Sequence, residues 1–154
     1  MKPLRILFVC HGNICRSPMA EFCMKDLVRK AGLEDRYEIS SAATSSEELG
    51  EPVYPPARRV LASHGIDCAG KRARQITRDD YDRFDLIVGM DHSNLRGMMR
   101  VFGSDPQNKV LLLSSFSGRR EDVDDPWYTR DFDYAWLQIE EGCRAMLGEL
   151  TKQE

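Results

Sequence analysis

No apolar run in this 154-residue chain approaches the length of about 20 residues that crosses a membrane. The apolar segment near the N-terminus is too short for a cleaved signal, so we expect a cytoplasmic protein with no membrane partner. A net charge of only −3 gives no sign of a nucleic-acid partner. The three histidines and five cysteines show no zinc-type spacing. We therefore expect no metal site and no complete disulfide framework.

Two common phosphate-binding loops are also missing from the sequence. No Gly-Lys-Ser/Thr follows the first apolar run, which excludes a Walker A loop, and the glycine triplet of a dinucleotide-binding fingerprint is absent. We therefore predict no cofactor. A phosphate site in this chain needs another kind of loop.

Strand and helix patterns alternate along the chain. They predict strands at 4–10, 37–42, 84–90 and 109–113, and helices at 18–31, 55–64, 91–102 and from 132 to about 150. Such alternation favours a parallel sheet covered on both faces. We predict one α/β domain over residues 1–154: a three-layer sandwich with a four-stranded parallel sheet. Ligands in such folds bind beyond the carboxyl ends of the strands.

The most informative segment is the end of the first predicted strand. Cys10 ends the strand, Arg16 follows six residues later, and Ser17 and Pro18 resemble an N-cap and a first helical turn. Backbone N–H groups at a helix N-terminus form an anion site, and Arg16 adds a guanidinium. We expect the Cys10 thiol in that field to be largely thiolate near neutral pH. A bound phosphate would then lie directly over a nucleophile.

The spacing alone permits a simpler interpretation, in which a buried cysteine ends a strand and the arginine lies on the surface. The position at a strand-to-helix junction favours the anion site. Gly12 and Asn13 inside the loop tolerate the unusual backbone angles that a nest of amides requires.

The chain resembles the low-molecular-weight protein tyrosine phosphatases. The matching segments, in family order and covering nearly the whole chain, are Val9–Glu21, Ser40–Ser45, Arg72–Gln75, Gly89–Leu95 and Asp124–Tyr128. The resemblance implies metal-independent hydrolysis of phosphotyrosine in proteins through a cysteinyl-phosphate, with Cys10 as nucleophile. It also implies a phosphate-binding loop made by the amides of His11, Gly12, Asn13, Ile14, Cys15 and Arg16.

A thiolate that cleaves a phosphate ester also needs an acid for the departing oxygen. Asp125 is the candidate, since it lies between the fourth strand and the last helix. Asp-Pro pairs are common turn starters, so the residues alone leave Asp125 open, with Asp124 as the nearest rival. The resemblance favours Asp125, because the family's general acid stands in the same Asp-Pro context.

The resemblance also suggests walls for a substrate pocket. Trp127 and Tyr128 could be a core plug, but beside the acid they suit stacking on an aryl leaving group. The family often has a second aromatic residue where this chain has Glu47. That departure puts a two-sided aromatic slot in doubt, and we expect it to disfavour phosphopeptides with acidic flanks.

Asn13, Ser17 and Ser41 resemble the family's hydrogen-bond network beneath the loop. We expect the Ser17 hydroxyl to stabilise the thiolate, to cap the helix, or both. Lys71 stands near the place where several family members have a histidine, and we predict a surface lysine there. Cys15 is a small buried residue or, as in similar enzymes, a disulfide partner of Cys10.

Three other functions remain open. An arsenate reductase needs a redox cysteine pair at short spacing, whereas Cys68 stands alone. Phosphoarginine phosphatases tend to have threonine at the position of Ile14, so Ile14 favours an aryl phosphate. An inactive phosphotyrosine-binding module is disfavoured, because Cys10, Arg16 and Asp125 are all present. The expected partner is a phosphotyrosine-containing protein, with phosphate or a similar oxyanion in the loop, and the expected state is a monomer.

Overall fold

The computed structural model describes residues 2–152 and confirms the α/β fold. Four strands, β1 (Leu4–Cys10), β2 (Tyr37–Ala43), β3 (Leu86–Gly89) and β4 (Val110–Leu112), form one sheet in the order β2-β1-β3-β4. All three pairings are parallel. The chain moves from β1 to one side of the sheet and later to the other, so the loop after β1 lies where the connections diverge. That point is where open parallel sheets bind ligands.

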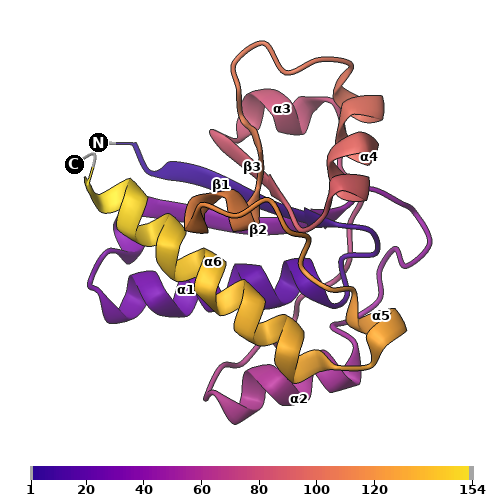
Figure 1. Ribbon diagram of the computed structural model, residues 1–154, viewed down its shortest axis with the longest axis vertical. Coiled ribbons are helices and arrows are strands. Elements are labelled where there is room, and N and C mark those ends of the chain that lie inside the picture. The colour runs from indigo at the N-terminus through magenta and orange to yellow at the C-terminus, as the bar shows by residue number, and fades with distance from the viewer. Residues whose placement is uncertain (1, 153–154) are drawn as a thin grey trace.

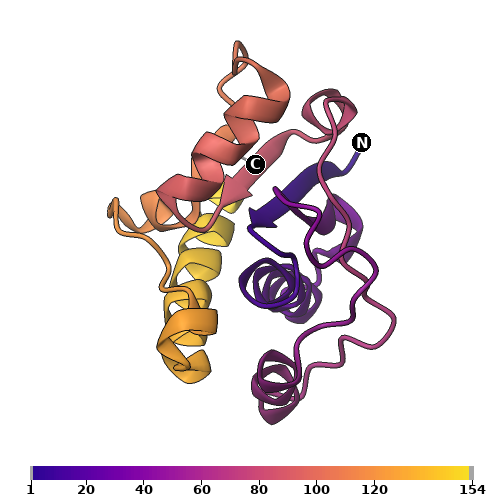
Figure 2. The ribbon, with the colours of Figure 1, turned by 90° about the vertical axis from the view of Figure 1, so that its right-hand side faces the viewer.

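Helices cover both faces of the sheet (Figure 1). The larger helices are α1 (Arg16–Lys30), α2 (Pro55–Ser63), α4 (His92–Phe102) and α6 (Phe132–Lys152), and the shorter ones are α3 (Asp79–Arg83) and α5 (Pro126–Thr129). In Figures 1 and 2, α1 and α6 lie on one side of the sheet with α2 beyond them, while α3 and α4 lie on the other. The layers are those of the predicted three-layer sandwich.

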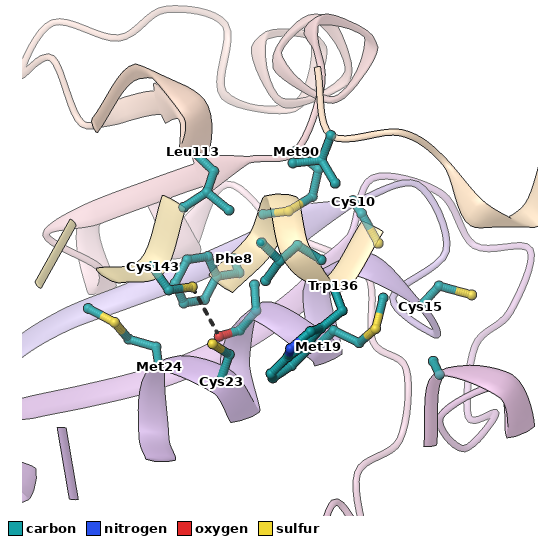
Figure 3. Packing of buried hydrophobic residues seen from close by; sticks show 14 of the residues in the cluster. Phe8, Cys10, Cys15, Met19, Cys23, Met24, Met90, Leu113, Trp136 and Cys143 are labelled. Atoms are coloured by element: carbon teal, nitrogen blue, oxygen red, sulfur yellow. Dashed lines mark hydrogen bonds between the residues drawn. The ribbon is translucent and has the colours of Figure 1, made fainter. Parts of the chain in front are cut away.

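The two faces of β1 build two separate cores, because successive side chains of a strand point to opposite sides. Ile6 and Phe8 pack toward α1, α2 and α6, and Leu7 and Val9 pack toward α3 and α4. All four side chains are completely buried. The first core contains several sulfur-bearing side chains, among them Met19, Cys23, Met24 and Cys143 (Figure 3). The resulting burial on both faces holds the carboxyl end of β1 in place.

Two close approaches between elements depend on glycine. A Cβ on Gly97 of α4 would stand 2.9 Å from Cγ2 of Thr44, the residue that follows β2. A Cβ on Gly142 of α6 would stand 2.5 Å from Cγ of Leu113. Both helices therefore come closer to their neighbours than any side chain would permit.

The sequence patterns placed the main elements within a few residues and missed the shortest ones. The third predicted strand was too long, because Phe84 and Asp85 precede β3 and Met90 follows it. Helices α3 and α5 and the 3₁₀ turns at Glu34–Arg36 and Leu113–Ser117 were not predicted. Within residues 2–152, no helix combines the length and the apolar character that a membrane span requires.

Candidate active site

The loop after β1 curls around the sulfur of Cys10. The amide of Asn13 donates to Cys10 Sγ at 3.3 Å, and the amide of Ser17 donates to it at 3.4 Å. Asn13 has a φ of 59°, a left-handed conformation that a β-carbon disfavours. The loop thus turns its N–H groups inward around a buried thiol. This arrangement suits an anion held above the sulfur.

The prediction that Ser17 caps α1 was wrong. The helix begins at Arg16, its N-cap is Cys15, and no side chain caps it. Ser17 lies inside the first turn, completely buried, with its Oγ 3.0 Å from Cys10 Sγ. Pro18 occupies the first turn as predicted. The serine hydroxyl is therefore directed at the thiol rather than at the free amides of the helix.

A buried network fixes the direction of that hydroxyl. The Asn13 side-chain amide donates to Ser17 Oγ at 2.8 Å and to Ser41 Oγ at 2.9 Å. Ser41 Oγ in turn donates to Glu21 Oε1 at 2.5 Å. Since the Ser17 oxygen accepts from Asn13, its single proton has two acceptors within reach: Cys10 Sγ at 3.0 Å and the Ala42 carbonyl oxygen at 3.5 Å. Asn13 Oδ1 accepts from the backbone amide of Arg74, which ties the loop to the chain after α2.

The prediction of a surface position for Lys71 was also wrong. Its side chain is only 12% exposed, and Nζ lies 3.6 Å from Glu21 Oε1. Nζ also donates to the carbonyl oxygen of Ser41 at 2.9 Å. Burial lowers the pKa of Lys71, and the charge of Glu21 opposes that shift. Lys71 therefore anchors the far end of the network together with Lys25, whose Nζ lies 2.6 Å from Glu21 Oε2, because a carboxylate in this interior is costly unless cations compensate it.

Arg16 is clamped by two carboxylates and a carbonyl. Nη1 donates to Asp91 Oδ2 at 2.8 Å and to the Val123 carbonyl at 2.9 Å, while Nη2 is 3.4 Å from Asp125 Oδ2. The residue is 2% exposed. Burial by itself lowers the pKa of Arg16, but the negative charges of Cys10, Asp91 and Asp125 raise it overall. The guanidinium is thus a fixed cation beside the thiol.

Asp125 faces the same hollow, and its neighbour Asp124 does not line it. The hollow has a volume of about 140 Å³ and is lined by Cys10, His11, Gly12, Ile14, Cys15, Arg16, Glu47, Glu48, Asp125, Trp127 and Tyr128. Asp125 caps α5, with Oδ1 accepting from the Trp127 amide at 3.0 Å. The cap holds one carboxylate oxygen and leaves Oδ2 near Arg16. Of these two neighbouring carboxylates, Asp125 is the one that lines the hollow and contacts Arg16.

The walls of the hollow differ in chemistry. Trp127 packs against Tyr54 with ring centroids 5.1 Å apart, and Tyr128 is 81% exposed. Across the lining, Glu47 Oε2 lies 2.9 Å from His11 Nε2. Glu47 thus occupies the expected pocket position, accompanied by a second carboxylate, Glu48, that the sequence analysis did not single out.

Cys15 lines the hollow but is buried. Burial raises the pKa of its thiol, and the charge of Cys10 raises it further. The Cys15 thiol therefore resists deprotonation. A disulfide between them stays a prediction.

Besides Glu48, three residues of the site were missed by the sequence analysis. Asp91 follows β3 at the carboxyl edge of the sheet, a position that could have marked it beforehand. Glu21 is four residues after Ser17 on α1, so both lie on one helix face. Tyr54 carried no signal, because its contact with Trp127 depends on how the segment before α2 folds back over the site.

Comparisons with known proteins agree with this geometry. Residues 5–154 match the family model described as low molecular weight phosphotyrosine protein phosphatase. The low molecular weight protein-tyrosine-phosphatase YfkJ of Bacillus subtilis is 35% identical over 153 residues, covering 98% of each chain. Its crystal structure superposes with a TM-score of 0.96 over 100% of this chain and 98% of that one, at 34% identity.

Two further relatives broaden the comparison. The low molecular weight phosphotyrosine protein phosphatase of Homo sapiens is 38% identical over 147 residues, or 92% of each chain. The crystal structure of a Drosophila arginine phosphatase has a TM-score of 0.86 and 35% identity, covering 96% of this chain and 98% of that one. The chain belongs to the low molecular weight phosphotyrosine protein phosphatase family.

Proposed function

We propose that this protein hydrolyses phosphotyrosine in proteins through a cysteinyl-phosphate, without a metal ion. The observation that carries the proposal is the convergence on one hollow of a buried thiol, a clamped guanidinium and a carboxylate. Arg16 and the amides supply a positive field at the place where a phosphoryl group would sit. We propose that residues 1–154 form one phosphatase domain.

In the first step, the Cys10 thiolate attacks phosphorus and the bond from phosphorus to the phenolic oxygen breaks. The amides of residues 11–16 and the Arg16 guanidinium hold the equatorial oxygens, a geometry for which a planar fork of donors is suited. Asp125 gives its proton to the departing oxygen, so that a neutral tyrosine leaves.

In the second step, a water attacks phosphorus and the bond from phosphorus to sulfur breaks. Asp125, now a carboxylate, takes a proton from that water. The thiolate leaves with the Ser17 hydroxyl beside it, and the Asn13 side-chain amide, which donates to both Ser17 Oγ and Ser41 Oγ, keeps that hydroxyl in place. Inorganic phosphate departs, and Cys10 is ready for another cycle.

Two observations bear on the choice between phosphotyrosine and phosphoarginine. Ile14 is buried and lines the hollow, which provides an apolar surface for an aromatic ring. Trp127 offers an indole beside Asp125, which suits a phenyl leaving group. The likeness to an arginine phosphatase makes phosphoarginine the alternative to be measured.

All five cysteines are free and buried. A mechanism that depends on a free thiolate suits a reducing compartment, and we propose the cytoplasm. We also propose a monomer that acts on phosphoproteins; sedimentation analysis at two concentrations tests the oligomeric state.

The deciding experiment measures hydrolysis of p-nitrophenyl phosphate, a phosphotyrosine peptide and a phosphoarginine peptide, with EDTA present. Wild type and Cys10→Ser are compared, and circular dichroism checks that the variant folds. Turnover that favours phosphotyrosine and disappears in the variant is expected. A preference for phosphoarginine would refute the substrate class, and a folded wild type without turnover would refute the reaction.

A further inference from the structure

The acidic wall, defined as Glu47 and Glu48, lies directly on the rim of the hollow. The segment after β2 is fixed to the loop by its backbone: the Thr44 amide donates to the Cys10 carbonyl at 2.9 Å, and the Ser45 amide to the His11 carbonyl at 3.1 Å. The hydroxyl of Ser45 also donates to the His11 carbonyl, at 2.9 Å. The carboxylates of the wall are therefore carried by an ordered segment that moves with the loop.

The side chain of Glu48 packs closely over Gly12 of the loop. A Cβ on Gly12 would stand 3.3 Å from Glu48 Cγ. The contact places a carboxylate-bearing side chain above an amide that faces the phosphate site. Glu48 thus lies against the loop and lines the hollow.

Within residues 2–152, the negative charges of the acidic wall have few cationic partners. Glu47 pairs with the exposed side chain of His11, while the carboxylate of Glu48 has neither an ion pair nor a hydrogen bond in that range. Arg16, the cation of the hollow, is already engaged by Asp91 and Asp125. A phosphate dianion entering the hollow therefore meets two carboxylates at the rim, which repel it unless a cation comes with it.

We infer that the acidic wall binds a lysine or arginine next to the phosphotyrosine of the substrate. The inference rests on the proposed function and specifies its substrate class: phosphotyrosine with a basic flank. A cationic side chain beside the phosphorylated residue reaches the wall, relieves its repulsion of the phosphate and gains an ion pair. An acidic flank adds further repulsion.

The test compares phosphotyrosine peptides that are identical except for flanking residues, which are all Lys, all Ala or all Glu. Each exposed ion pair contributes up to about fivefold, so we expect kcat/KM for the Lys peptide to exceed that for the Glu peptide by about tenfold or more. The ratio should shrink in 0.5 M salt, because these charges are exposed and screened.

The same ratio is then measured in Glu47→Gln/Glu48→Gln, with Glu51→Gln as the matched control. Glu51 is an exposed acid of the same segment that does not line the hollow. The double variant should bring the ratio to about twofold or less, and the control should keep it. Thermal unfolding checks that the variants fold.

Three results would overturn the inference. The first is a wild type that hydrolyses the Lys and Glu peptides equally well or prefers the Glu peptide. The second is a Lys-to-Glu ratio of kcat/KM that survives the double substitution, and the third is a ratio that is lost equally in the Glu51→Gln control. In each case, continued hydrolysis of p-nitrophenyl phosphate leaves the proposed function standing. Absence of that hydrolysis in the folded wild type would instead remove the proposed function, and the inference with it.

Discussion

The loop around Cys10 and the rim of the hollow are adjacent but built differently. Around the thiol, Asn13, Arg16 and Ser17 are at most 2% exposed, and each makes hydrogen bonds to more than one partner. On the rim, Trp127 is 46% exposed and Tyr128 81% exposed. A substitution in the buried part leaves hydrogen-bonding groups without partners, whereas rim side chains can be exchanged at small structural cost.

This difference suggests that the reaction and the choice of substrate are controlled by separate parts of the site. Substitutions beneath the hollow should reduce kcat or stability, because they remove partners that are buried. Substitutions on the rim should alter KM or the preference between substrates.

The sharpest contrast is expected from Arg16→Lys. A lysine has one compact charge and cannot engage Asp91, the Val123 carbonyl and two phosphoryl oxygens together. We expect kcat/KM for p-nitrophenyl phosphate to fall about 10³-fold. Arg130, which lies over the ring of Trp127 and donates to the Tyr54 hydroxyl, is the control outside the loop, and Arg130→Lys should lose less than about fivefold. Comparable losses in the two variants would erase the distinction between loop and rim.

Asp125→Asn tests whether the acid belongs to the reaction or to the rim. We expect kcat for a phosphotyrosine peptide to fall about 10²-fold, and kcat for p-nitrophenyl phosphate to fall much less, because p-nitrophenolate leaves without a proton. Asp124→Asn is the matched control and should change neither rate. Equal losses for both substrates would argue against proton donation by Asp125.

Lys71→Met removes the buried end of the network. We expect the free energy of unfolding to decrease by about 2 kcal/mol, since Glu21 loses a buried partner. Lys25→Met removes a cation from the same carboxylate, 2.6 Å away but 45% exposed, and should cost less than about 0.5 kcal/mol. Urea unfolding of both variants measures the difference; similar values would show that burial does not set the effect.

Trp127→Ala is the matching change on the rim. We expect KM for a phosphotyrosine peptide to rise about fivefold with kcat within about twofold, because the indole contributes contact area rather than chemistry. Tyr134→Ala, an exposed aromatic of α6 outside the hollow, should change neither constant. A large fall in kcat would mean that the indole also positions Asp125.

The smallest effect is a loss of stability in alkaline solution that depends on Cys15. Burial raises the pKa of its thiol above the ordinary value of 9.0. Above pH 9 the unfolded chain loses this proton and the native chain keeps it, so stability falls as pH rises. Cys15 contributes about 0.8 kcal/mol of that fall by pH 9.5. In Cys15→Ala, urea unfolding at pH 7 and pH 9.5 should show a correspondingly smaller difference.

The sequence predicted those features that local chemistry determines. The apolar run of β1 followed by Cys10 and Arg16 marked the phosphate site, and the alternation of elements predicted the parallel sheet. Asp125 was reached only with the help of the family resemblance, because an Asp-Pro pair by itself indicates a turn.

Features that depend on distant packing were not predictable in the same way. Ser17 carries the usual signal for an N-cap, yet the loop turns early and takes it into the helix. Lys71 has no apolar pattern around it that signals burial, and its position depends on Glu21, which is 50 residues earlier in the chain. Glu48 became part of the site through the fold of the segment after β2.

Gly97 does not line the hollow, yet it affects the position of the loop around Cys10. This glycine allows α4 to touch Thr44, and the amide of Thr44 bonds to the carbonyl of Cys10. In a saturation mutagenesis screen scored by phosphatase activity, position 97 should therefore tolerate substitution as poorly as a reactive residue. Such a screen would show that position 97 requires glycine because even a methyl group collides with Thr44. The face of α4 that packs against Thr44 should therefore be left unaltered in enzyme engineering.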